Sequence, residues 1–141
     1  MEERYMSNIT STSRTIHFNH IWQDEEVIVD ANNYEFIEYS SGILHLNNGM
    51  FEDCYAANET DFKELQKAAN QIDRFKSFEN YILNFSKIVD FSYYSDELII
   101  TLRTKKSTYD IEVSNKENFE KLIEFLSGRY KLSSEYEIQD L

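Results

Sequence analysis

Residues 34–56, with the sequence YEFIEYSSGILHLNNGMFEDCYA, contain the pattern that decides the fold class. Apolar and polar side chains alternate on both sides of Gly42, as they do in strands with one buried face. Asn48-Gly49 is a strong hairpin signal, because both residue types tolerate a positive φ. We therefore predict a strand before Gly42 and a β-hairpin after it.

Upstream, residues 15–22 also alternate, and Val27-Ile28-Val29 is a short β-branched run, so both read as strands. Downstream, the period changes to that of a helix. Phe62, Leu65, Ala69 and Ile72 recur at helical spacing, with Asn58 or Thr60 as the N-cap. A second apolar stripe consists of Phe78, Tyr81, Ile82, Phe85 and Ile88. We expect two helices, or one bent helix, between about residues 60 and 88.

The second half of the chain repeats this order of elements. Residues 90–94, 98–103 and 109–113 read as strands. Ser114-Asn115-Lys116-Glu117 reads as a capping box, and Gly128 as the stop of the helix that follows it. Several residues between Phe36 and Leu44 match the second half at an offset of 55, and several between Asn58 and Ala69 match it at an offset of 57. Either a duplication or independent convergence on one pattern explains the match.

These elements predict an α+β fold, in which an antiparallel sheet has helices packed on one face. Two β-hairpin–helix units are one possible arrangement of it. We expect a flexible N-terminal segment over residues 1–14, a single α+β domain over 15–132, and a C-terminal edge strand or tail over 133–141. One domain is the usual outcome for a chain of 141 residues.

The acidic residues are concentrated in one part of the chain. The net charge is −12, and the stretch from Thr15 to Phe62 has ten carboxylates but no Lys or Arg. A negative charge argues against direct binding to nucleic acid or to an anionic membrane. The sequence shows neither a signal peptide nor an apolar span, and the single cysteine suits a reducing compartment. We expect a cytoplasmic protein of a bacterial host cell, encoded by a low-GC bacterium or its phage.

Residues with catalytic or metal-binding potential are few and scattered. His17 and His20 lie three apart, which places them on opposite faces of a strand, and His45 is remote from them in sequence. Cys54 follows Glu52 and Asp53, whose charges disfavour a thiolate. Asp61-Phe62-Lys63 resembles the acid-x-Lys triplet of one nuclease superfamily, but it sits at a helix start. We therefore predict no enzyme activity, no metal site and no cofactor.

The composition favours a protein-binding inhibitor that docks on a basic, nucleic-acid-binding surface of a partner protein or nuclease. A phage anti-defence or anti-CRISPR-type protein is the first choice. An immunity protein against a basic nuclease toxin is the alternative, as is a non-catalytic adaptor that pairs through an edge strand. The residues expected to bind the partner are eight carboxylates and three tyrosines: Asp24, Glu25, Glu26, Asp30, Glu35, Glu38, Glu52, Asp53, Tyr34, Tyr39 and Tyr55.

Overall fold

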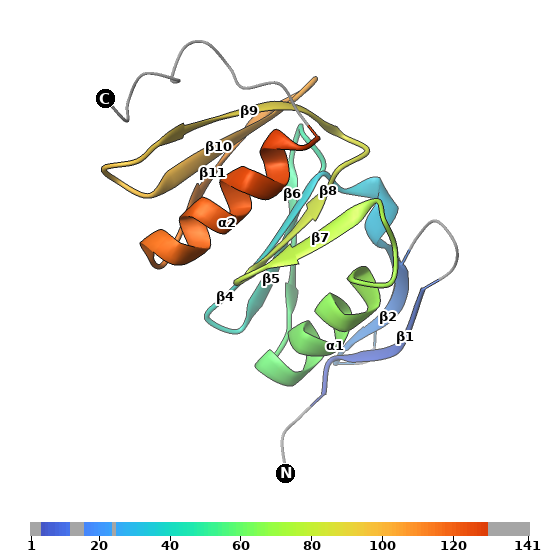
Figure 1. The fold of residues 1–141 in the computed structure, drawn as a ribbon. Helices are drawn as coiled ribbons and strands as arrows, with labels where there is room; N and C mark the ends of the chain where they lie inside the picture. The colour runs from blue at the N-terminus through green and yellow to red at the C-terminus, as the bar shows by residue number, and fades with distance from the viewer. Residues whose placement is uncertain (1–3, 12–15, 24, 130–141) are drawn as a thin grey trace. The chain divides into compact units, whose positions relative to one another are not determined.

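The computed structural model describes residues 4–11, 16–23 and 25–129. These residues form antiparallel sheets and two α-helices, so the α+β class is confirmed at this level (Figure 1). The chain divides into two compact units, the first ending at Ser86 and the second beginning at Lys87. These are unit 1 (residues 1–86) and unit 2 (residues 87–141).

Unit 1 begins with a three-stranded sheet in the order β1-β2-β3, made of β1 (Met6–Ser11), β2 (Ile16–Trp22) and β3 (Glu25–Asp30). In β2, alternate side chains are buried, as the sequence predicts. β1 lies within the N-terminal segment that we expected to be frayed, and it pairs with β2. The expected tail over 133–141 lies outside the described residues.

The five-stranded sheet of unit 1 has the order β6-β5-β4-β8-β7. Its strands are β4 (Phe36–Ser40), β5 (Ile43–Asn47), β6 (Glu52–Ala56), β7 (Phe75–Phe78) and β8 (Tyr81–Asn84). Ser41 and Gly42 join β4 to β5 with φ values of 50° and 80°, which matches the primed two-residue turn that suits a hairpin. The hairpin predicted at Asn48-Gly49 is confirmed as the β5–β6 pair.

The core of unit 1 combines residues of this sheet, of α1 (Glu59–Ala69) and of the three-stranded sheet. The N-cap of α1 is Asn58, which is one of the two residues predicted for this position. Its side chain accepts a hydrogen bond from the Asp61 backbone N–H at 2.8 Å. Phe62, Leu65 and Ala69 belong to the same buried cluster as Ile37, Leu44 and Leu46. α1 therefore covers the face of the sheet on which Ile37 lies.

The second helix predicted between Phe78 and Ile88 is wrong, because these residues form β7, β8 and the start of β9. Glu79 has a φ of 48° and begins a tight turn with Asn80, which places Phe78 opposite Tyr81. Ile82 and Leu83 are both buried although they point to opposite faces of β8. A strand that is buried on both faces has no alternation, so periodicity does not distinguish it from a helix.

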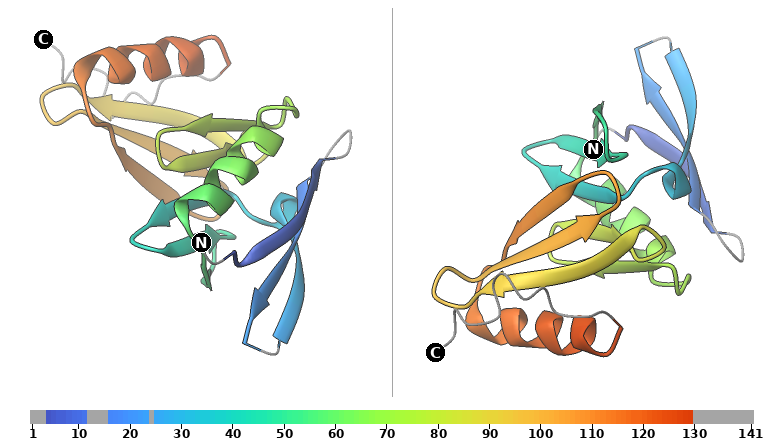
Figure 2. Two further views of the ribbon diagram at one scale, coloured as in Figure 1. Left: turned by 90° about the horizontal axis from the view of Figure 1, so that it is seen from below. Right: turned by 90° about the horizontal axis from the view of Figure 1, so that it is seen from above.

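Unit 2 is a three-stranded sheet, in the order β11-β10-β9, followed by a helix. The elements are β9 (Ile88–Tyr94), β10 (Ile99–Thr104), β11 (Thr108–Glu112) and α2 (Lys116–Ser127). Figure 2 shows α2 alongside the sheet, and the ring of Phe119 meets the ring of Tyr93 edge-on at 5.9 Å. The N-cap is Asn115, whose side chain accepts a hydrogen bond from the Asn118 backbone N–H, so the prediction of Ser114 as the capping residue is wrong.

The offsets in the sequence correspond to matching strand registers. Phe36 pairs with Asn47 in β4–β5, and 55 residues later Phe91 pairs with Leu102 in β9–β10. The helices nevertheless contact opposite faces, because α1 packs on the side of Ile37, whereas α2 meets Tyr93, the counterpart of Glu38. Among the described residues, neither helix has the length and apolar character needed to cross a membrane.

Candidate metal centre

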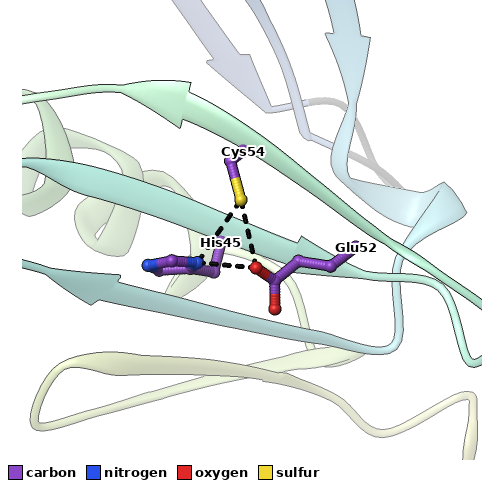
Figure 3. Close-up of side chains that lie close together, drawn as sticks. All are labelled: His45, Glu52 and Cys54. Carbon is purple, nitrogen blue, oxygen red and sulfur yellow. Dashed lines mark hydrogen bonds and ion pairs between the residues drawn. The ribbon is translucent and has the colours of Figure 1, made fainter.

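Three side chains with metal-binding atoms converge on the β5–β6 hairpin of unit 1. His45 in β5 is the direct cross-strand partner of Cys54 in β6. Glu52 lies two residues before Cys54 and therefore projects from the same face. Figure 3 shows the three side chains gathered on this face, which is the one opposite Ile37 and α1.

The donor atoms of this His45–Glu52–Cys54 cluster all lie within 4.8 Å of one another. Oε1 of Glu52 is 2.8 Å from Nδ1 of His45 and 3.0 Å from Sγ of Cys54. Sγ and Nδ1 are 3.5 Å apart. His45 is partly buried, whereas Glu52 and Cys54 are exposed, so the cluster is accessible from solvent.

The Glu52 carboxylate controls the charge state of the cluster. Hydrogen bonds from the Cys54 thiol and from His45 lower the pKa of Glu52. The hydrogen bond to Glu52, with a smaller effect of burial and of the Asp53 charge, raises the pKa of Cys54 to about 11. This direction agrees with the expectation that acidic neighbours disfavour the Cys54 thiolate, and a metal ion would have to displace the thiol proton.

The donor set matches the preferences of zinc. Zn²⁺ takes thiolate, imidazole and carboxylate ligands, with bond lengths near 2.3 Å to sulfur and about 2.0–2.2 Å to nitrogen and oxygen. At tetrahedral angles these bonds place N and O about 3.4 Å apart, and S about 3.6 Å from either. The S–N separation of 3.5 Å already fits, and the two distances to Oε1 of 2.8 and 3.0 Å need a widening of roughly half an ångström. Rotation of the exposed Glu52 side chain can provide it.

The sequence does not show this cluster, because it depends on strand register. In the sequence, His45 is only a possible third histidine beside His17 and His20, and nothing in the spacing selects a histidine partner for Cys54. His17 and His20 do lie on opposite faces, and His20 is buried with Nε2 2.7 Å from the carbonyl oxygen of Ala56. The hairpin centred on Asn48-Gly49 was the available signal, since its register brings His45 opposite Cys54.

The eight carboxylates proposed to bind a partner are spread over several environments. Glu25 and Glu26 are exposed in β3, and Asp30 caps the short 3₁₀ turn that follows β3. Glu35 is buried, with 5% of its surface exposed, whereas Glu38 is partly exposed on the same face as His45. Asp24 lies outside the described residues.

Asp53 and the three tyrosines of that set have contacts within unit 1. The Tyr34 hydroxyl donates a 2.7 Å hydrogen bond to Asp53, and burial followed by this contact raises the pKa of Tyr34. Tyr55 packs against the ring of His20, and Tyr39 stacks on Phe62. The participation of this set in partner binding stays a prediction.

Asp61 of the Asp61-Phe62-Lys63 triplet has a structural environment at the start of α1. Its carboxylate is fully buried and accepts hydrogen bonds from Nε of Arg4 at 2.5 Å and from the Tyr5 backbone N–H at 3.0 Å. Its position in the first turn of a helix agrees with the sequence analysis.

Comparison with known proteins gives few matches. No protein-family model and no curated protein matches the chain. One solved structure with a match is described as the LytTr DNA-binding domain of a response regulator from Bacillus cereus. It is 16% identical, the match covers 76% of this chain and 95% of that chain, and the TM-score is 0.49.

This neighbour contradicts the inhibitor hypothesis, since it is a DNA-binding domain and is not an anti-CRISPR, anti-defence or immunity protein. It equally contradicts our expectation of a basic protein partner without direct contact to nucleic acid, and nothing supports a phage origin. Net charge misled us because it describes the whole surface and does not specify a fold. The DNA-binding role of that neighbour is not transferred to this chain, so the functional proposal rests on the cluster itself.

Proposed function

We propose that unit 1 binds a transition-metal ion, with Zn²⁺ as the best match, through Nδ1 of His45, Oε1 of Glu52 and Sγ of Cys54. The observation that carries this proposal is the convergence of three different donor types within 4.8 Å at partly or fully exposed positions on one hairpin. The donors come from adjacent strands of one hairpin, which fixes their backbone positions before the ion arrives.

The donor types select the class of ion. Thiolate and imidazole are soft or borderline ligands that suit Zn²⁺ and its neighbours, whereas Ca²⁺ and Mg²⁺ require oxygen ligands. Three protein ligands leave a fourth tetrahedral position, which a water molecule fills in an accessible site. A bound metal would join β5 to β6 near the end of their hairpin and stabilise unit 1 against unfolding.

Three further features belong to this proposal. The role is binding without catalysis, as the sequence analysis expects.

The compartment is the bacterial cytoplasm, because a free thiol ligand persists where glutathione and thioredoxin keep cysteines reduced. The domain is built from two strand–helix units, and matching registers in β4–β5 and β9–β10 together with the N-caps Asn58 and Asn115 support that division.

A competition titration tests the proposal. The full chain, stripped of metal with a chelator, is titrated with Zn²⁺ in the presence of a chromophoric zinc indicator. We expect one equivalent to bind to the wild type, and Cys54→Ser and His45→Gln to lose that binding. Glu25→Gln, which removes an exposed carboxylate from β3, is the matched control and should bind as the wild type does. Equal zinc binding by wild type and Cys54→Ser would contradict the proposal.

A further inference from the structure

Glu38, His45 and Cys54 form one row across three neighbouring strands. In the register, Glu38 of β4 is the partner of His45 of β5, and His45 is the partner of Cys54 of β6. Directly opposite residues of an antiparallel pair point to the same face, with Cβ atoms about 4.5–5.5 Å apart. The row therefore places a carboxylate on the side of His45 that is opposite Cys54.

The corresponding row in unit 2 has a different chemistry. Applying the offsets of 55 and 57 residues, Tyr93, Ile100 and Ile111 take the places of Glu38, His45 and Cys54, and these three residues also pair in one row. Ile100 and Ile111 are completely buried, and Tyr93 contacts Phe119 of α2. The two rows occupy equivalent positions in their sheets. The row in unit 2 is apolar or aromatic and contacts a helix, whereas the row in unit 1 consists of three potentially ionisable side chains.

The ring of His45 has two nitrogen atoms, and the cluster uses only one of them. Nδ1 is the atom that approaches Glu52 and Cys54. When a metal occupies Nδ1, the proton of the neutral ring is on Nε2, which becomes a hydrogen-bond donor. Histidine ligands almost always donate this second N–H to a carboxylate, a carbonyl or a water molecule, which fixes the ring orientation.

Glu38 is the carboxylate available for this donor. Of the other carboxylates in β4, β5 and β6, Glu52 is already a ligand, and Asp53 points to the opposite face, where it accepts the Tyr34 hydroxyl. In the described part of the chain, the Glu38 carboxylate forms no hydrogen bond or ion pair, and its side chain is partly exposed. It is therefore free to turn towards His45.

We infer that Glu38 is a positioning residue of the metal centre: it accepts the Nε2–H of His45 and so holds Nδ1 towards the ion. This inference rests on the proposed function, and it extends the site from the β5–β6 hairpin to β4. Removing such a carboxylate from a metal site typically lowers metal affinity about 10- to 100-fold.

The inference is tested by measuring the zinc affinity of three single-residue variants of the whole 141-residue chain. Glu38→Leu removes the acceptor, and Glu38→Gln keeps a neutral acceptor of similar size. Ser40→Ala, at an exposed position on the same face of β4, is the matched control. We expect Glu38→Leu to weaken Zn²⁺ binding about 10- to 100-fold. Glu38→Gln should recover part of that loss, and Ser40→Ala should leave the affinity unchanged.

A spectroscopic readout separates positioning from a purely structural effect. In zinc-loaded wild type, long-range ¹H–¹⁵N NMR spectra should show His45 protonated at Nε2 in a single state. Glu38→Leu should lose that single state even where its urea unfolding curve without metal matches the wild type. If Glu38→Leu does not fold, the affinity of Glu38→Gln and the same NMR signature decide.

The outcomes separate the two proposals. A wild type that fails to bind Zn²⁺ overturns both the proposed function and this inference. A wild type that binds, together with an unchanged affinity in Glu38→Leu, overturns only the role of Glu38. If Glu38→Leu loses zinc affinity while the NMR signals of the His45 ring stay the same, the role of Glu38 as a positioning residue is also overturned, because Glu38 would then not act through His45.

Discussion

His45 and Cys54 face each other across the β5–β6 pair, with Nδ1 3.5 Å from Sγ. This separation is close to the one that two ligands of a tetrahedral zinc ion adopt, about 3.6 Å. Oε1 of Glu52 lies near both atoms and accepts a hydrogen bond from each. The cluster therefore holds protons where a metal ion would bind, and proton competition should govern its affinity.

Zinc affinity should depend steeply on pH. The pKa of Cys54 is raised to about 11, so the thiol is protonated at pH 7 to 8 and each bound ion releases this proton. Because one proton competes with one ion, the Kd for Zn²⁺ should rise about tenfold when the pH falls from 8 to 7. Indicator titrations at several pH values measure the slope. A Kd that does not change over this interval would show that the thiolate is not a ligand.

Alkylation of Cys54 should be slow in the metal-free protein and faster in Glu52→Gln. A pKa raised above its ordinary value means less thiolate at pH 8, and Glu52 is the largest cause of that shift. Removing it increases the thiolate fraction up to about a hundredfold, but nucleophilicity falls with the pKa. The net gain in rate is therefore several-fold to about tenfold. Iodoacetamide kinetics with Glu25→Gln as control measure it, and equal rates would refute the role of Glu52.

The buried carboxylate of Asp61 should contribute measurably to the stability of unit 1. Asp61→Ala removes the acceptor of the Tyr5 backbone N–H and one of the two carboxylate partners of Arg4, and loss of the acceptor for a buried donor costs about 1–3 kcal/mol. Urea unfolding should show this decrease in the free energy of unfolding. Glu64→Gln removes only the exposed partner of Arg4, and we expect it to change that free energy by less than about 1 kcal/mol. Similar losses in the two variants would contradict the account.

The N-cap of α2 should be Asn115 in solution as well. Asn115→Ala removes the acceptor for the Asn118 backbone N–H, which costs about 1 kcal/mol of stability at an N-cap. Ser114→Ala should cost about half as much or less, because Ser114 does not occupy the cap position. Hydrogen exchange of the first-turn amides of α2 locates the effect. A larger loss in Ser114→Ala would favour the capping box predicted from the sequence.

Local patterns predicted much of the fold. The turn signal at Asn48-Gly49 predicted the β5–β6 hairpin, and Gly42 predicted the end of the strand before it. Asn58 was one of the two predicted N-caps of α1. The pattern failed at Ile82 and Leu83, where burial on both faces of β8 removes the alternation that marks a strand.

The candidate site was beyond the reach of local patterns. His45, Glu52 and Cys54 are separated in sequence, and only the register of the β5–β6 pair brings them together. The same register places Glu38 of β4 in line with His45, whereas Glu35 precedes β4 and is buried. Acidic composition drew attention to the carboxylates as a group, although their environments differ from one residue to the next.

The most direct test of the central claim is a cobalt titration of the metal-free chain, followed by absorption spectroscopy. Co²⁺ takes the same ligands as Zn²⁺, and a cobalt–thiolate bond produces an intense charge-transfer band in the near ultraviolet. We predict that this band reaches its maximum at one equivalent of Co²⁺, disappears on addition of Zn²⁺ and is absent from Cys54→Ser. A titration without a charge-transfer band, or with the same band in Cys54→Ser, would contradict the claim that His45, Glu52 and Cys54 bind a metal ion.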